Sequence, residues 1–139
     1  MAATFTVERN AGRLIEAKVR TLRTVQQVDE YGRALGEAMR WVPAGTRPVL
    51  CADHRAVTIY PAAVADRLTE LFEKMNARLE RVAILVARTN ATLSMQLERI
   101  VREANNPSRR VFHEGSEAIE HLGEVLDVDE RVRLGRFLS

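Results

Sequence analysis

Three short polar stretches contain the side chains of this sequence that are best suited to chemistry or recognition. They are Asp53-His54-Arg55, Arg88-Thr89-Asn90 and His113-Glu114. Each stretch follows a run of apolar residues that predicts a buried strand, and each precedes a predicted helix. In an open α/β sheet, ligands usually bind beyond the carboxyl ends of the parallel strands. Helix N-termini at that edge present free backbone N–H groups, which favour anions.

Asp53 and His54 are the candidates for a general acid–base pair. Neighbouring residues on a strand point to opposite faces, so a shared site would require the strand to end between them. Polar residues at strand ends are also the default in such a fold, so we expect no catalytic residues and no enzymatic activity. Arg55 and Arg88 could bind a phosphate or could be solvated arginines at the rim of the molecule.

No metal, cofactor or nucleic-acid site is expected. His54, His113 and His121 belong to different predicted elements, and the single cysteine, Cys51, is expected to be buried in a strand. The sequence contains neither a glycine-rich phosphate-binding motif nor the Gly-x-Ser-x-Gly motif of hydrolases. Basic and acidic residues are interleaved, the formal net charge is +2, and aromatic residues make up 5% of the chain. This pattern excludes a concentrated basic or base-stacking face.

The connection after Asp53 is unusually apolar. Val57, Ile59 and Tyr60 must either fold back on the core or face a partner, and both alternatives remain open from sequence. On the second alternative, this connection and the neighbouring strand end form a surface for a protein partner. The candidate partner-binding residues are His54, Arg55, Val57, Thr58, Ile59, Tyr60, Arg88, Thr89 and Asn90.

Hydrophobic periodicity predicts the elements that position these residues. A hairpin is expected from two alternating segments, 4–9 and 13–22, joined by the turn Asn10-Ala11-Gly12. Apolar strands are expected at 47–53, 82–87 and 109–113. Helices are expected at 24–42, 61–77, 90–104, 116–126 and 129–138, with Trp41 packed against the sheet.

The order β-β-α-β-α-β-α-β-α predicts an α/β fold with a single, mostly parallel sheet and an N-terminal hairpin. Residues 82–87 are apolar throughout, as expected of a central strand that is covered by helices on both faces. We expect one domain over residues 1–139. No stretch has the roughly 18 uncharged apolar residues that would span a bilayer. With no secretory signal pattern and one cysteine, the sequence predicts a cytoplasmic protein without membrane insertion.

The most motif-like stretch is Arg110-Val111-Phe112-His113-Glu114-Gly115-Ser116-Glu117-Ala118-Ile119-Glu120-His121-Leu122. It combines a short Val-Phe strand, an acidic cap, a Glu-Ala pair and an apolar helix. Together with the opening hairpin and the order of elements over residues 5–126, it resembles the STAS superfamily, the fold of sulfate-transporter and anti-sigma-factor-antagonist domains. The similarity is closest to stand-alone SpoIIAA-like or STAS/SEC14-like bacterial proteins.

This resemblance implies a non-catalytic protein-interaction module with a regulatory or scaffolding role. Phospho-regulated members carry Asp-Ser-Ser-Gly where this chain has Ile59-Tyr60-Pro61-Ala62-Ala63, which contains no serine. The nearest hydroxyl belongs to Thr58, so the phosphorylation switch is not carried over. The alternative is a carrier of a small anionic or lipidic ligand, which requires an internal pocket. A homodimer is also possible, because the first strand lies at a sheet edge and residues 128–138 could cover an edge or a partner.

Overall fold

The computed structural model describes residues 3–139, which form a single five-stranded mixed sheet and five helices. The fold is therefore of the α/β class. The strands are β1 (Phe5–Ala11), β2 (Leu14–Val19), β3 (Val49–Asp53), β4 (Arg81–Leu85) and β5 (Arg109–Phe112). The helices are α1 (Val25–Met39), α2 (Ala62–Met75), α3 (Ala91–Ala104), α4 (Gly115–Gly123) and α5 (Val128–Leu138). None of the helices in the described residues is both long and apolar enough to cross a membrane.

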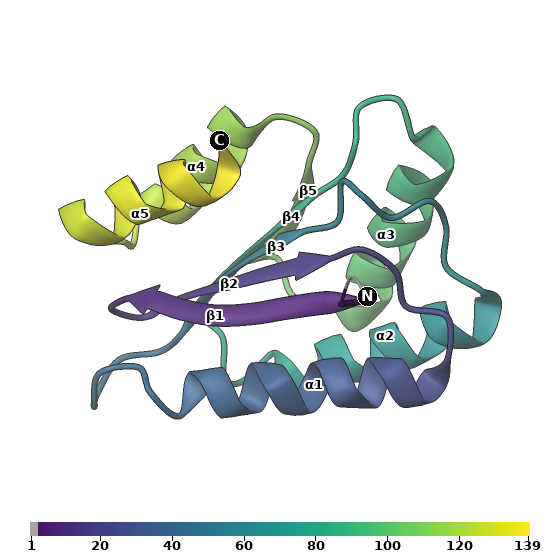
Figure 1. Cartoon of the computed structure of the whole chain (residues 1–139), viewed down its shortest axis with the longest axis horizontal. Coiled ribbons are helices and arrows are strands. Elements are labelled where there is room, and N and C mark those ends of the chain that lie inside the picture. Colours follow the sequence, from purple (N-terminus) through teal and green to yellow (C-terminus); the bar gives the residue numbers. More distant parts are fainter. Residues whose placement is uncertain (1–2) are drawn as a thin grey trace.

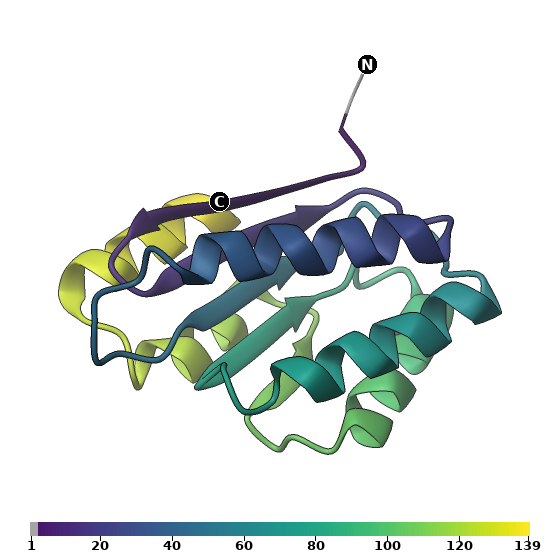
Figure 2. The ribbon, with the colours of Figure 1, turned by 90° about the horizontal axis from the view of Figure 1, so that it is seen from below.

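The strands lie in the sheet in the order in which they occur in the chain. β1 and β2 form the expected antiparallel hairpin, whereas β2, β3, β4 and β5 pair in parallel. Right-handed crossovers between neighbouring parallel strands place every connecting helix on the same face of a sheet. The remaining helices, α4 and α5, cover the opposite face. Figure 1 shows α1 and α2 below the sheet and α4 and α5 above it, and Figure 2 shows the strands from below.

The sheet consequently has an apolar core on each face. Val82 and Ile84 of β4 pack into the cluster beneath α1, α2 and α3, whereas Ala83 and Leu85 pack beneath α4 and α5. All four side chains are at most 1% exposed. Burying one Val, Leu or Ile side chain contributes roughly 1.5–3 kcal/mol, so Val82, Ile84 and Leu85 contribute strongly to the stability of the fold.

The first helix is shorter than its pattern predicts, and this places Trp41 outside the core. α1 ends at Met39, whose buried side chain takes the last core position of the helix. The expectation that Trp41 packs against the sheet is wrong, because its side chain is 70% exposed. Trp41 follows the C-cap residue Arg40 and lies beside β1 at the edge of the sheet.

The last helix packs on a face of the sheet. Leu134 and Leu138 are buried there with Leu14 of β2. A capping box formed by Asp127 and Glu130 begins the helix, one residue earlier than the periodicity predicts. The second carboxylate oxygen of Glu130 accepts the backbone N–H of the hairpin residue Arg13, 117 positions earlier in the chain, at 2.7 Å. This bond fastens α5 to the turn of the hairpin.

Candidate functional site

The loop between β3 and α2 folds back over the carboxyl end of the sheet. His54 is the first residue after β3 and is fully buried, and the hydroxyl of Tyr60 lies 2.6 Å from its Nδ1 atom. Val57 is also buried, so three side chains anchor the loop from beneath. Burial disfavours the charged imidazolium and lowers the pKa of His54 to about 4, although the neighbouring Asp53 acts in the opposite direction.

Helix α3 holds the backbone of the same loop. Asn90 Nδ2 donates to the carbonyl oxygens of Thr58 at 2.7 Å and Val57 at 3.3 Å. Gln96 accepts the backbone N–H of Tyr60 at 3.0 Å and donates to the Tyr60 carbonyl at 2.7 Å. These bonds satisfy backbone groups that have no partner in a helix or strand, and they fix the conformation of the loop.

The structure separates the predicted partner-binding residues into two groups. The exposed residues are Arg55, Thr58, Ile59, Arg88 and Thr89, and Asn90 is half-buried. The buried residues are His54, Val57 and Tyr60, so the expectation that they form the exposed part of a partner surface is wrong. Their side chains fill the space above the end of β3 and support the loop, so little of their surface is open to a partner. Ile59 is 55% exposed and has no such place in the core.

The two arginines of the predicted site are held by carboxylates. Arg55 Nε and Nη2 donate to the two carboxylate oxygens of Asp53, each at 2.9 Å. Burial alone would raise the pKa of Asp53, but the hydrogen bonds from Arg55 outweigh it and lower the pKa overall. Arg88 forms an ion pair with Glu114, which precedes α4. The Arg55 guanidinium therefore has a defined position at this end of the sheet.

A groove lies beside the exposed part of the loop. It has a volume of about 510 Å³, and Arg20 and Arg23, which follow β2, line it together with Thr58 and Ile59. Within the described residues, neither of these arginines forms an ion pair with an acidic side chain. The groove adds two more cations to the surroundings of Ile59, and sequence reasoning did not place them there.

Sequence reasoning also missed Met95, which is 71% exposed on α3. A signal was present, because Leu93, Leu97 and Ile100 define the buried face of this helix and position 95 falls outside it. Met95 adjoins Gln96 in the chain, and Ile59 adjoins Tyr60. Since Gln96 and Tyr60 are hydrogen-bonded to each other, both exposed apolar side chains lie at the same end of the molecule.

The chain matches no protein-family model, and no curated protein matches its sequence. Ile59 is an exposed apolar residue with arginines around it. The nearby side chains of Asp53 and His54 are hydrogen-bonded to Arg55 and Tyr60.

Asp53 and His54 do not assemble into a shared acid–base site. Strand alternation directs them to opposite faces, where Asp53 binds Arg55 and His54 binds Tyr60. With a pKa of about 4, His54 is neutral near pH 7. Its other ring nitrogen, Nε2, is buried and has no hydrogen-bond partner among the described residues. This arrangement makes His54 a support of the loop.

A second pair was not predicted from sequence. The hydroxyl of Ser94 on α3 lies 2.9 Å from Nε2 of His113, which follows β5. A serine that acts as a nucleophile requires a base that is oriented by a third group. In residues 3–139, no carboxylate is hydrogen-bonded to His113, and Ser94 is buried. The bond joins the first turn of α3 to the residue that follows β5.

The described residues contain no group of three or more His, Cys, Asp or Glu side chains that could hold a metal ion. Cys51 is fully buried within β3, as its apolar neighbours predict. Burial raises the pKa of its thiol well above the ordinary value, so the reactive thiolate form is suppressed.

Proposed function

We propose that the chain is a non-catalytic protein-interaction module of STAS-like fold with a regulatory or scaffolding role. Its contact surface, which we call the loop surface, consists of Arg55, Thr58, Ile59, Arg88, Thr89 and Met95. The observation that carries this proposal is the exposure of Ile59 on a loop whose backbone is tied to α3 on both sides of it. An apolar side chain held outward at such a position is the arrangement expected of an interface anchor.

Rigidity supports the assignment. Binding costs conformational entropy when a loop must be ordered, and a loop already fixed by Asn90 and Gln96 has lost that freedom before the partner arrives. The arginines at the rim predict a partner that is acidic around an apolar centre, because complementary charge steers association and sets specificity. Arg20 and Arg23 are the free cations best placed for this role.

The remaining parts of the proposal follow from the resemblance and the composition. The module acts in the bacterial cytoplasm, in a signalling system whose partner is a protein. No serine occupies the position of the phosphorylation switch, so that switch is not part of the proposal. Thr58 is exposed, and its carbonyl accepts from Asn90.

The test is a comparison of three purified proteins. A partner is first captured and identified with the wild-type chain, and its dissociation constant is then measured for wild type, Ile59→Asp and Val132→Asp. Val132 is the matched control, because it is 54% exposed on α5, across the sheet from the loop surface. We expect Ile59→Asp to weaken binding at least tenfold, the size typical of a lost interface anchor, and Val132→Asp to leave it unchanged. If Ile59→Asp binds the partner as tightly as the wild type does, the loop surface is not the binding site.

The ligand-carrier alternative has one observation in its favour. Arg109 is buried against the ring of Phe72, donates to Asn76 at 2.6 Å, and has no carboxylate partner among the described residues. It lines an internal apolar cavity with Tyr31. The volume of that cavity is only about 10 Å³, which is the space of a single water molecule. A carrier would require α1 and α2 to separate, and native mass spectrometry of protein from its host would show a retained ligand.

A further inference from the structure

The edge strand β1 is a second surface that the loop surface does not explain. β1 is the first strand of the sheet and pairs with β2 alone. Figures 1 and 2 show it along the outside of the sheet, beside α1. It is seven residues long and contains neither proline nor lysine, the residues with which proteins commonly protect an edge. We propose that two copies of this chain form a symmetric dimer by antiparallel pairing of their β1 strands.

The hydrogen bonds of the hairpin show which backbone groups are available. The N–H of Arg20 donates to the carbonyl of Thr4 at 2.8 Å. Because bonded and non-bonded pairs alternate along an antiparallel ladder, Thr6 and Glu8 are the next residues whose backbone groups face β2. The N–H and C=O groups of Phe5, Val7 and Arg9 therefore point outward from the sheet.

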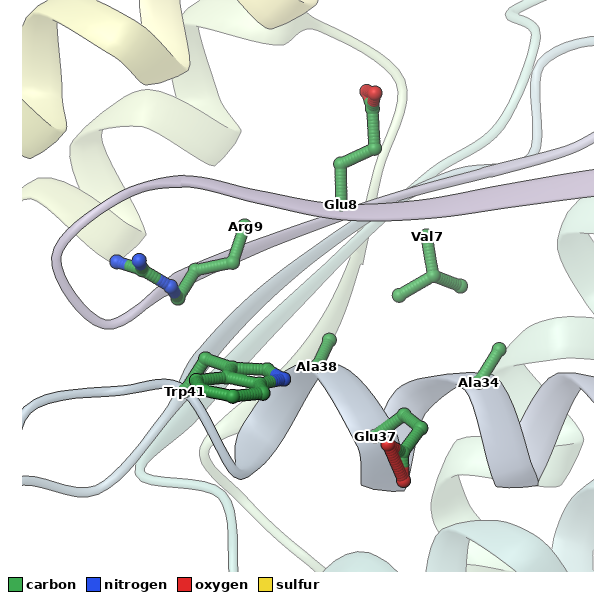
Figure 3. A pocket seen from close by; sticks show the side chains of 7 residues that line it. All are labelled: Val7, Glu8, Arg9, Ala34, Glu37, Ala38 and Trp41. Carbon is green, nitrogen blue, oxygen red and sulfur yellow. The ribbon is translucent and has the colours of Figure 1, made fainter.

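Beside this edge lies an open groove with an apolar floor. It has a volume of about 510 Å³ between β1 and the second half of α1. Figure 3 shows Val7 directed toward α1, where Ala34 and Ala38 lie, and Trp41 at the end of the groove beside Arg9. Glu8 points to the other side of the strand. With a 70% exposed side chain, Trp41 is the largest apolar group available for burial at this edge.

The sequence of β1 is complementary to itself in one register. Pairing requires outward-facing residues to meet, and placing Val7 opposite Val7 of the second copy also places Phe5 opposite Arg9 and Glu8 opposite Thr6. A slip that pairs Val7 with Arg9 would bring the two Glu8 carboxylates directly opposite each other, which is unfavourable. The opposite slip pairs Phe5 with Val7 and leaves Arg9 without a strand residue to face. Charge and length therefore both favour the register centred on Val7.

In this register the second copy also covers Trp41. Arg9 lies beside Trp41, and this register sets Phe5 of the second copy, whose ring packs on Tyr31 of its own chain, directly opposite Arg9. Aromatic and cation–π contacts of this kind stabilise interfaces, and tryptophan is the residue most enriched among interface anchors. The pairing is isologous, so each copy uses its β1 edge once and the assembly closes at two chains.

The paired segment is short. A register shift between Arg9 and Ala11 ends the regular ladder, which leaves Phe5 to Arg9 for pairing. An interface of this length with one tryptophan on each side lies at the small end of specific interfaces, so we expect a dissociation constant of about micromolar order.

The dimer is tested by sedimentation velocity of the full chain over about 1–200 µM, a range that brackets a micromolar dissociation constant. We expect the wild type to shift from monomer to dimer with concentration. Trp41→Ala removes an exposed side chain, and Val7→Pro removes an N–H that points away from β2, so both variants are expected to fold and remain monomeric. Val132→Ala, at an exposed valine of α5, is the control and is expected to dimerise like the wild type.

Disulfide trapping tests the register separately. Val7→Cys is expected to form a linked dimer under mild oxidation, because directly opposite residues bring their Cα atoms within disulfide range. Glu8→Cys is expected to form none, and the native thiol of Cys51 is buried. Three results would each overturn the proposal. The wild type could be monomeric at every concentration, Trp41→Ala and Val7→Pro could dimerise normally, or the disulfide could form through Glu8→Cys in place of Val7→Cys. Ile59→Asp is expected to remain dimeric, so failure of this dimer and failure of the loop surface are distinguishable.

Discussion

The Tyr60 hydroxyl and the His54 Nδ1 atom lie 2.6 Å apart, and both side chains are buried. This contact closes the loop that begins where β3 ends, because its first side chain and one near its end bind each other across its base. The apolar loop is thereby divided into a supporting layer and an outer layer. Ile59 belongs to the outer layer because Tyr60 occupies the inner position.

Replacing Tyr60 by Phe removes this hydrogen bond and leaves His54 without a side-chain partner. We expect the free energy of unfolding to fall by about 1–3 kcal/mol, the cost of an unsatisfied buried polar group. Urea denaturation at neutral pH measures the change. Tyr31→Phe is the matched control, since Tyr31 is equally buried and its hydroxyl has no hydrogen bond within the described residues. An equal effect of both substitutions would show that the hydroxyl of Tyr60 contributes nothing specific.

The burial of His54 makes stability depend on pH. Its pKa is about 4 in the folded chain against 6.5 for an exposed histidine, so the unfolded chain binds the proton first as the pH falls. The stabilisation is complete above the unfolded value and is lost as the pH falls toward the folded value. Between about pH 7 and about pH 5 we expect a loss of roughly 2 kcal/mol from this group.

The measurement is urea denaturation of wild type and His54→Gln at both pH values. Asp53 has a lowered pKa, so its own contribution is lost only at more acidic pH. The variant should therefore lose clearly less stability than the wild type over this interval. Parallel pH profiles of the two proteins would show that His54 is not the titrating group.

Gly12 is required by the contact between the hairpin turn and α5. Its φ angle is +49°, and a Cβ atom built on it would overlap the Glu130 carboxylate that accepts from Arg13. We expect Gly12→Ala to destabilise the chain by about 2 kcal/mol or more, from the left-handed backbone and the displaced carboxylate together. Gly45→Ala is the control, because Gly45 has a φ of +82° but open space around it. If thermal unfolding shows that Gly12→Ala and Gly45→Ala lose the same stability, the clash with Glu130 contributes nothing.

Asn90 has two functions that one pair of substitutions separates. Its side-chain oxygen caps α3 by accepting the N–H of Leu93 at 2.9 Å, and its amide nitrogen holds the loop at Thr58. Asn90→Asp keeps the cap and loses the donor, whereas Asn90→Ala loses both, and loss of a cap costs about 1 kcal/mol.

We expect Asn90→Asp to fold with nearly normal helix content but to show faster amide exchange at Ile59 and Tyr60. Asn90→Ala should show the same loop exchange and, in addition, lower stability. Hydrogen exchange measured by mass spectrometry checks both expectations. Unchanged protection of the loop in Asn90→Asp would show that Asn90 does not hold it.

The elements of the fold follow from local pattern. The uninterrupted apolar run around Ile84 predicts a strand that is buried on both faces, and the structure has Val82 and Ile84 under one helical layer and Ala83 and Leu85 under the other. Alternation predicts the hairpin, and helical spacing predicts each helix to within a few residues. These features can be predicted locally, because the residues that share one face of a strand or helix recur at a fixed spacing. That spacing does not depend on which element packs against the face.

By itself the sequence determined the class of fold, the approximate element boundaries and the edge of the sheet near which recognition is expected. It left undecided which residues of the apolar loop are inside, and it misplaced Trp41 at the end of α1. Those outcomes depend on partners far away in the chain: Tyr60 is held by Gln96, 36 residues later, and Trp41 lies in a groove with Val7. Only tertiary structure brings such partners together, because packing near strand ends is decided by the space that distant elements leave and not by periodicity.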